Sequence, residues 1–386
     1  MLKDAQELQP QLVAWRRDIH MHPELGFEEK RTAALVAETL EKQGYRVRSG
    51  VGRTGIVGEL GQGTPVVAIR ADMDALPIDE ANPVPYASTH RGIMHACGHD
   101  AHVAMALGAA MLLSRTRWPG TVRFLFQPSE EVGDAEGISG APRMLEDGAM
   151  QGVDFVIAQH VDVDTAVGNI RVEAGPASGG VDSFFGKVIG KGAHGARPQE
   201  SVDPFCLAAQ IILALNTIVS RRLNPFDPGV VSLGSVHGGH TQNVIPSEID
   251  LTGTLRYTEP RVQSQIHAEI ERAFQVARAL GGDYTLRFER GSLPMMNDAM
   301  AVQLMREVAG DVLGPGHVLA LEKDLGAEDF AVFLAAAPGA MFLLGARRAG
   351  DERLAHNPRF DIDESALPYG TAMLAEITMR YLNKPR

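Results

Sequence analysis

The sequence predicts an α/β protein with a mostly parallel sheet, helices on both faces, and a smaller α+β domain that interrupts it. In the outer parts of the chain, short apolar runs bounded by turn residues alternate with helical patterns, as in parallel sheets covered by helices. In the middle of the chain, the expected strands instead alternate apolar with polar residues. With 386 residues, the chain is long enough for two or three domains.

The first forty residues have the apolar spacing of a helix, interrupted at 21–32 by the segment MHPELGFEEKRT. The helical pattern resumes over 32–43. Gly44 then supplies a stop, because glycine adopts the left-handed conformation that commonly ends a helix.

Four apolar runs are expected to be strands buried on both faces, since each is short and bounded by turn signals. They are 66–70, 122–126, 155–159 and 340–345. A helical stretch, 101–115, lies between the first two.

The middle of the chain favours a sheet with one free face. Its expected strands are 186–190, 230–236, 249–257 and 284–290, and its expected helices are 203–222 and 259–281. The α/β pattern resumes at 297–314. We therefore expect a discontinuous domain of 1–181 and 295–386, with 182–294 inserted into it.

Charge and hydropathy exclude several classes of protein. The formal net charge is -12, so nucleic acid is an unexpected partner. The longest apolar stretches, such as 103–113, are shorter than the roughly 18 residues that cross a bilayer, and the N-terminal sequence has no signal-peptide core. We expect a cytoplasmic protein with no membrane partner.

Cysteine and histidine gather in one segment, HRGIMHACGHDAH at 90–102. Cys97 and His99 are expected to bind a metal, because thiolate and imidazole both suit zinc-like ions. His90 and His95 are expected to be surface or capping residues. The other cysteine, Cys206, lies in an apolar helical stripe and is expected in a core.

Potential ligands also follow three of the expected strands. Asp72 and Asp74 follow the first, Glu130 and Glu131 the second, and His160 the third. The carboxyl ends of parallel strands share one edge of a sheet, where functional groups collect. We therefore expect these side chains to meet there.

The adjacent acids Glu130 and Glu131 indicate metal-assisted hydrolysis. In an extended segment they would point to opposite sides, so that one can bind metal while the other moves protons. Asp74 is expected to orient a ligand from behind. His356 lies in a polar loop after the last strand, where a lone histidine is more often a surface residue.

Taken in order, several short motifs resemble the aminoacylase and hippurate-hydrolase metallopeptidase family. They are DMDALP, HACGHDAH, QPSEE, a histidine after the third strand, GKGAHGARP, NVIP, GTLR, GAEDF and a late histidine. The likeness is strongest to the branch of bacterial N-acyl-amino-acid amidohydrolases and plant auxin-conjugate hydrolases. It extends roughly from His20 to Tyr369.

The resemblance implies a centre of two divalent metal ions: zinc, manganese, cobalt or nickel. It assigns Glu130 as the general acid and base, and it gives Asp72 no metal. The implied ligands are Cys97, His99, Glu131, His160 and His356.

The resemblance also implies that 182–294 is a lid and dimerisation domain, so that the protein is a homodimer or a higher homo-oligomer. His194 would then reach the partner's active site and polarise the scissile carbonyl. Asn243 and Arg256 would contact the substrate carboxylate and the oxyanion. For Arg256, a strand-surface arginine paired with an acid remains the alternative.

The function expected from this resemblance is hydrolysis of the amide bond of small N-acyl amino acids, such as N-acetyl or N-benzoyl derivatives. A dipeptidase or carboxypeptidase could use the same centre. The sequence also leaves open a catalytically silent ligand-binding protein and a cysteine hydrolase that uses Cys97 with His99.

Overall fold

The computed structural model describes residues 1–321, 324–348, 350 and 354–384, which form two compact units. The described residues of the first unit are 1–177, 296–321 and those from 329 on. The second unit comprises Ser178–Met295 and 324–328. It therefore contains the expected insertion, 182–294, and also a short later segment, whose Gly326 carbonyl accepts a hydrogen bond from Gly179 N–H (2.9 Å).

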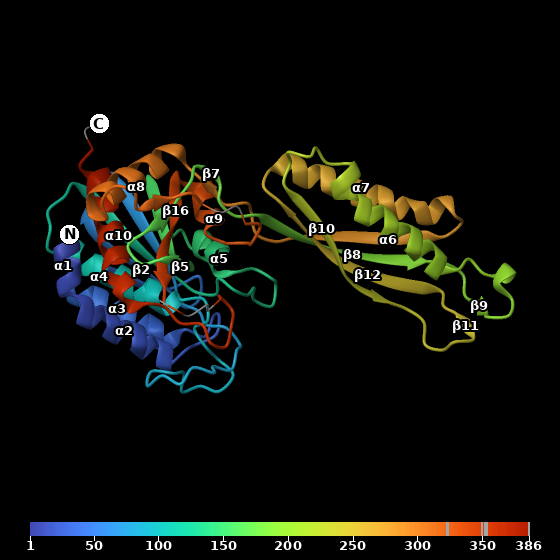
Figure 1. Ribbon diagram of the computed structural model, residues 1–386, viewed down its shortest axis with the longest axis horizontal. Helices are drawn as coiled ribbons and strands as arrows, with labels where there is room; N and C mark the ends of the chain where they lie inside the picture. Colours follow the sequence, from blue (N-terminus) through green and yellow to red (C-terminus); the bar gives the residue numbers. More distant parts are fainter. Residues whose placement is uncertain (322–323, 349, 351–353, 385–386) are drawn as a thin grey trace. The chain divides into compact units, whose positions relative to one another are not determined.

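An eight-stranded sheet forms the centre of the first unit (Figure 1). Its four middle strands are parallel neighbours and contain all four expected apolar runs, which confirms the predicted class. In sheet order they are β4 (Gly120–Gln127), β3 (Val66–Asp72), β5 (Phe155–Ala166) and β16 (Gly339–Arg347).

The edges of this sheet were not predicted. On one side, β2 (Gly55–Gln62) runs antiparallel to β4 and pairs with β1 (Arg46–Val51). On the other side lie β6 (Ile170–Arg171), antiparallel to β16, and β15 (Val318–Leu319). These strands are polar, glycine-rich or very short, so they lack the continuous apolar run of a buried strand.

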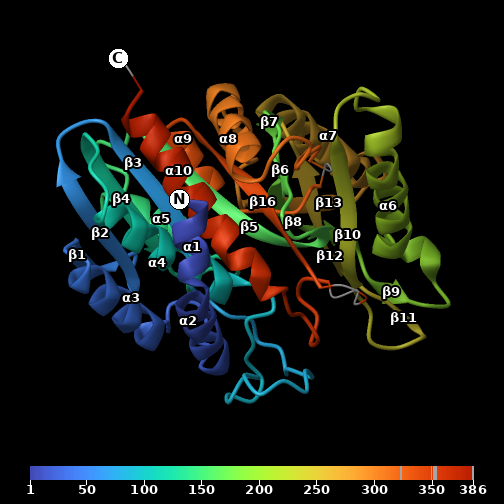
Figure 2. The same ribbon diagram turned by 60° about the vertical axis from the view of Figure 1, so that its left-hand side comes forward.

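Helices cover both faces of the sheet. The chain crosses from β3 to β4 through α4 (His99–Ser114), and from β4 back past β3 to β5 through α5 (Gly140–Glu146). Because such crossovers are right-handed, these opposite directions place α4 and α5 on opposite faces. Helix α10 (Leu367–Leu382) packs on α4 and α8 (Ala299–Val312), and α9 (Ala331–Ala336) packs on α5 (Figure 2).

Three helices open the chain: α1 (Leu2–Glu7), α2 (Gln9–Met21) and α3 (Lys30–Lys42). The expected break before residue 32 is present, and a further break occurs at Leu8. Pro10 stands in the first turn of α2, where its missing N–H leaves no intrahelical bond unmade. Gly44 follows α3 with φ +85°, the predicted stop.

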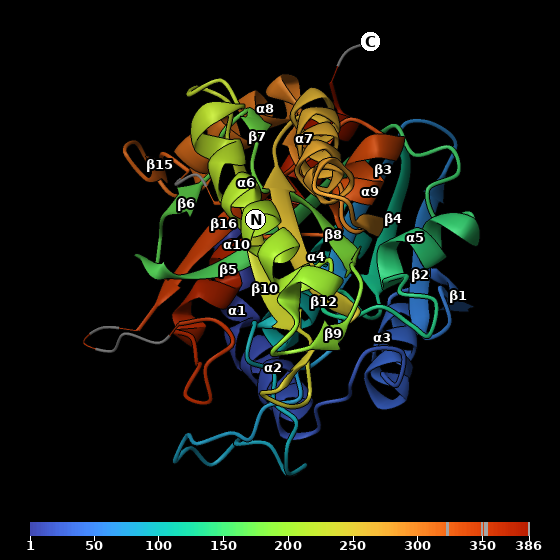
Figure 3. The same cartoon turned by 90° about the vertical axis from the view of Figure 1, so that its right-hand side faces the viewer.

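The second unit is an antiparallel sheet with both helices on one face (Figure 3). In sheet order, its strands are β10 (Gly229–His237), β12 (Glu248–Tyr257), β8 (Gly180–Ile189) and β13 (Asp283–Arg290). The helices are α6 (Pro204–Arg221) and α7 (Pro260–Ala279). Burial alternates strictly along β8, and Phe184 packs there against Phe274 of α7. The alternating sequence pattern is explained by this single packed face.

Several short elements complete the chain. Strand β9 (Ala193–His194) pairs with β11 (Val244–Ile245), and β7 (Gly175–Pro176) pairs with β14 (Met296–Asn297). Single 3₁₀ turns are η1 (Pro198–Glu200) and η2 (Glu364–Ala366).

Helix α6 is long and apolar enough to cross a membrane by length and composition. Its buried stripe, which includes Leu207, Ile211 and Leu215, nevertheless packs in the core of the second unit. Cys206 is adjacent to this stripe and is exposed, with Sγ 3.7 Å from Asp203 Oδ2. The prediction that Cys206 is a core residue was wrong, because the helical phase turns it outward.

A buried carboxylate holds the turn that follows β4. Glu29, between α2 and α3, accepts hydrogen bonds from the backbone N–H groups of Phe27 (3.0 Å) and Ser129 (2.8 Å) and from the Thr54 hydroxyl. Ser129 has φ +44°, which is strained for a residue with a side chain. Burial raises the pKa of Glu29 to about 7 in spite of these donors.

This pKa predicts that ionisation of Glu29 destabilises the protein. Since the folded-state pKa lies above the unfolded one, stability is highest below the unfolded pKa and falls as the pH rises to about 7. Glu29→Gln removes the ionisation. We expect the unfolding free energy of this variant, relative to wild type, to increase between pH 5 and 8 by at most about 3 kcal/mol.

Urea unfolding at several pH values in this range measures that difference. Glu28→Gln is the matched control, because it removes the same charge from an exposed neighbour. A difference between Glu29→Gln and wild type that stays constant across the range would contradict the prediction.

Candidate metal centre

The carboxyl ends of β3, β4 and β5 bring the expected ligands to one edge of the sheet. His160 was expected to follow its strand. Instead it lies inside β5, which continues to Ala166. The pairing of β3 with β5 ends at Arg70 and Ala158, so His160 lies just beyond the paired part, level with Asp72 at the end of β3. The sequence could not reveal this, because β5 is extended by its pairing with β16 alone.

Cys97 and His99 reach the cluster from the start of α4. Gly98 between them has φ +92°, and a Cβ at this position would lie 2.3 Å from Val161 Cγ2. Glycine is therefore required both by the backbone conformation and by the close approach of β5. The ligand atoms of Cys97, His99 and His160 lie within 4.8 Å of one another, with Cys97 Sγ 3.4 Å from His160 Nε2.

The two histidines each turn Nδ1 away from the cluster. His99 Nδ1 lies 2.9 Å from the Asp74 carbonyl oxygen, and His160 Nδ1 lies 2.8 Å from the Val161 carbonyl oxygen. Each Nδ1 can only donate to a carbonyl, so in the neutral ring each Nε2 carries the lone pair that a metal ion would take. His99 Nε2 is buried, no described residue forms a hydrogen bond with it, and Asp72 Oδ2 lies 3.6 Å away. This buried ring nitrogen beside a carboxylate fits a cation.

Glu130 and Glu131 both point into the cluster. Their carboxylates and His99 offer ligand atoms within 4.8 Å of one another. The expectation that the two side chains diverge was wrong, because the chain bends at both residues instead of remaining extended. The strained Ser129 precedes this bend.

His356 completes the cluster from the loop after β16. Its Nε2 lies 3.0 Å from Glu131 Oε1, and its ligand atom groups with those of Glu131 and Cys97. Its backbone N–H donates to the Ala96 carbonyl oxygen (2.8 Å), which joins this loop to the cysteine segment. The hydrogen bond to Glu131 raises the pKa of His356.

Two aspartates at the end of β3 have different partners. Asp74 Oδ1 lies 3.2 Å from His99 Nδ1, and Asp74 Oδ2 accepts from Glu131 N–H (3.0 Å). Asp72 is held by Arg70 Nη1 and His102 Nδ1, both at 2.6 Å. Asp74 thus contacts two expected ligands from behind, whereas Asp72 is held by Arg70 and His102 and places Oδ2 3.6 Å from His99 Nε2.

The electrostatics of the cluster favour a cation. Burial opposes protonation of His99, yet the charge of Asp72 and the hydrogen bond to Asp74 hold its pKa well above the usual value. Burial raises the pKa of the Cys97 thiol, and the charges of Glu131 and Glu130 act in the same direction. A divalent cation matches this excess of negative charge and would stabilise the thiolate.

The two remaining histidines of the 90–102 segment differ. His90 is exposed, as expected. His95 is buried, and burial lowers its pKa to about 4. The prediction of a surface or capping role for His95 was therefore wrong. His95 lies outside any helix or strand, so no periodicity indicates its burial.

The other expected site residues belong to the second unit. His194 in β9 pairs with Val244 in β11, and the Asn243 carbonyl oxygen accepts from Gly195 N–H (2.8 Å). His194 lines a cavity of about 1050 Å³ that also contains His237.

Arg256 in β12 donates from Nη1 to the Thr254 hydroxyl and to the Leu255 carbonyl oxygen (3.1 Å). None of the ion pairs found among the described residues involves it, so the interpretation as a surface arginine paired with an acid gains no support.

Comparison with known proteins identifies the family. The family model described as peptidase family M20/M25/M40 matches residues 68–380. An N-acetyl-L-cysteine deacetylase of Bacillus subtilis is 38% identical over 97% of this chain and 89% of its own length. A thermostable carboxypeptidase 2 of Saccharolobus solfataricus is 37% identical over 99% of this chain and 98% of its own length.

Among solved structures, the YXEP protein of Bacillus subtilis, described as a dinuclear metal-binding peptidase of the M20 family, superposes with a TM-score of 0.86. It is 33% identical, and the match covers 98% of this chain and all of that one. The chain, with its cluster of thiol, imidazole and carboxylate ligands at the sheet edge, therefore belongs to peptidase family M20/M25/M40.

Proposed function

We propose that this metal-dependent amidohydrolase cleaves N-acyl amino acids to a carboxylate and a free amino acid at the cluster around Glu130. The observation that carries the proposal is the convergence of all five expected ligands on this one carboxylate-lined site. The name of the deacetylase relative supports an N-acyl amino acid as substrate.

Two ions account for the arrangement best. Cys97 shares one group of ligand atoms with His99 and His160, and a second group with Glu131 and His356. With two ions bound, Cys97 would belong to both ligand sets, one with His99 and His160 and the other with Glu131 and His356. Zinc, manganese, cobalt and nickel all suit thiolate, imidazole and carboxylate ligands.

The protein residues divide the work of hydrolysis. When bound, divalent cations supply Lewis acidity next to the scissile amide. The Glu130 carboxylate takes the proton of the attacking water and later donates it to the departing nitrogen. Asp74 holds His99 and Glu131 in place through its two oxygens. Asn243 and Arg256 carry the donors for the substrate carboxylate and the oxyanion.

Rival functions make different demands on these residues. A carboxypeptidase activity has support from the name of one relative and needs a pocket that admits a peptide. A silent binding protein would not need Glu130 beside the ligands. A cysteine hydrolase that uses Cys97 with His99 would leave the convergence of Glu131, His160 and His356 without a role.

The first experiment measures amino acid release from N-acetyl, N-benzoyl and indole-acetyl amino acids and from dipeptides. We expect chelation to abolish release from the acyl derivatives, and zinc, manganese, cobalt or nickel to restore it. Faster cleavage of dipeptides would favour the carboxypeptidase activity. Release that resists chelation would exclude the metal centre as the catalyst.

Glu130→Gln tests the proton-transfer role. The amide cannot accept the proton of water, so we expect kcat to fall at least about 100-fold. Metal content, measured by elemental analysis, should remain at the wild-type value because the five ligands are intact. Glu136→Gln, an exposed acid further along the same loop, is the control and should retain activity. A Glu130→Gln variant with near wild-type kcat would refute the role.

The second unit offers a surface for a homodimer. Strand β10 lies at the edge of its sheet, with one side unpaired, and α6 packs beside it. The outward face of α6 exposes Phe205 (48%), Leu213 (63%) and Val219 (39%). An open strand edge next to an apolar helix face is typical of an interface between identical chains.

A cytoplasmic location stays a prediction from the sequence alone.

His194 should then act on the active site of the partner subunit. His194→Ala and Glu130→Gln proteins should each be inactive, but a refolded mixture should regain roughly a quarter of wild-type activity. Half of random dimers are mixed, and one of the two sites in each is complete. Activity of the mixture no greater than that of the separate variants would place His194 outside the partner's site.

A further inference from the structure

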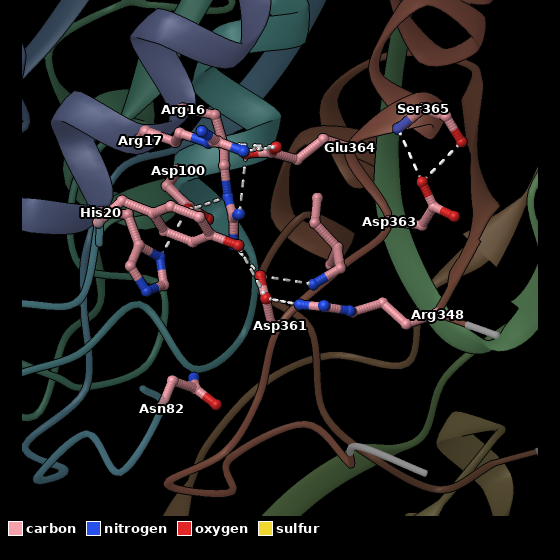
Figure 4. Close-up of polar contacts among 12 residues, drawn as sticks. Arg16, Arg17, His20, Asn82, Asp100, Arg348, Asp361, Asp363, Glu364 and Ser365 are labelled. Carbon is pink, nitrogen blue, oxygen red and sulfur yellow. Dashed lines mark hydrogen bonds and ion pairs between the residues drawn. The ribbon is translucent and has the colours of Figure 1, made fainter. Parts of the chain in front are cut away.

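One buried guanidinium connects two segments that carry ligands. Arg16 of α2 is completely buried, and its Nε donates to Asp100 Oδ2 (2.9 Å) while its Nη2 donates to Asp361 Oδ1 (2.7 Å) (Figure 4). Nη1 also donates to Glu364 Oε1 (3.1 Å). The planar fork of arginine directs donors to separate acceptors, which lysine cannot reproduce.

Each aspartate belongs to a ligand segment. Asp100 directly follows His99 in the first turn of α4. Asp361 lies five residues after His356 in the loop that follows β16. These two segments are more than 250 residues apart in the sequence, and Arg16 contacts both through a single rigid group.

The loop of His356 is held at several points. Residues 354–359 are exposed, and 53% of the His356 side chain is accessible. The His356 N–H donates to the Ala96 carbonyl oxygen, and the carbonyl oxygens of Pro358 and Phe360 accept from Ala81 N–H and Asn82 Nδ2 (both 2.8 Å). Farther along lies the buried Asp361, whose Oδ2 also accepts from the Tyr86 hydroxyl (3.0 Å) and from Arg348. Asp361 is therefore one of the groups on which the position of His356 depends, and it is the one that Arg16 holds.

Arg16 stays protonated throughout the pH range in which proteins are folded. Burial opposes its charge, but Asp100, Asp361 and Glu364 together raise its pKa. His20 Nδ1 lies 2.8 Å from the same Asp100 oxygen, which adds a second donor on the α4 side. Removing Arg16 would leave two buried carboxylates without their shared counter-charge.

We propose that Arg16 is a positioning residue of the metal centre: by holding Asp100 and Asp361 on one buried guanidinium, it helps to keep His356 within reach of Cys97 and Glu131. The residue touches neither metal nor substrate. The inference rests on the ligand set of the proposed function. It adds the group that connects the segment of His99 with the segment of His356.

Metal affinity tests this role directly. Arg16→Lys keeps the charge but loses the fork, and Arg16→Met removes both. We expect Zn²⁺ affinity, measured by competition with a chromophoric chelator, to fall about 10- to 100-fold in both variants. Arg17→Met is the matched control, because Arg17 also contacts Glu364 but neither aspartate. Its affinity should stay within about twofold of wild type.

Two further readouts separate positioning from general damage. In Co²⁺-loaded protein, the visible absorption of the thiolate-bound ion should change in Arg16→Lys and not in Arg17→Met. At saturating metal, Arg16→Lys should recover most of its kcat, since Glu130 is untouched. Asp361→Asn, which weakens the acceptor of Arg16 in the His356 loop, should weaken metal binding in the same direction.

The outcomes are distinct. Wild-type protein that binds no metal would refute the proposed function itself. Wild-type protein that binds metal, together with Arg16→Lys of equal affinity and unchanged Co²⁺ spectrum, would refute only the role of Arg16. If Arg16→Met does not fold, Arg16→Lys and Asp361→Asn decide the question alone.

Discussion

The edge at which β3 and β4 end, and past which β5 continues, is the constraint on which the site depends. Parallel strands must return through crossovers, so the segments that leave their carboxyl ends emerge side by side. Here those segments contain Asp74, the Glu130 and Glu131 bend, and His160 within the overhanging part of β5. Helix α4 then begins at the same edge, and Cys97 and His99 arrive with it.

Bringing these carboxylates, imidazoles and the thiol together is electrostatically unfavourable. Contacts behind the ligands hold them in place. Carboxylates and a thiol buried together repel one another, and burial raises the pKa of Cys97. The histidines are fixed through Nδ1 by carbonyl oxygens, and Asp74 connects His99 to Glu131. Behind them, Arg16 and Glu29 hold the chain segments themselves. A bound cation completes this charge balance.

Much of the fold was readable from periodicity. The four parallel strands appear as apolar runs because both of their faces are buried, and β8 alternates because one face is. Local sequence patterns did not predict the burial of residues whose surroundings are formed by distant parts of the chain. Cys206 lies one position outside the buried stripe of α6, and His95 is covered by remote segments. The burial of Arg16 was indicated by the sequence, since Arg16 lies on the apolar face of α2 with Leu12 and Ile19.

By itself, the sequence determined which chemical groups are present, their order, and the strands and helices that carry them, because these follow from local spacing and residue type. Tertiary structure decided which atoms of those groups meet. His160 reaches the cluster from within β5, level with the end of β3, and Glu130 and Glu131 converge because the chain bends after Ser129. The His356 N–H is bonded to Ala96, and Arg16 holds Asp361 farther along the same loop. These are contacts between segments far apart in the chain, and local spacing carries no record of them.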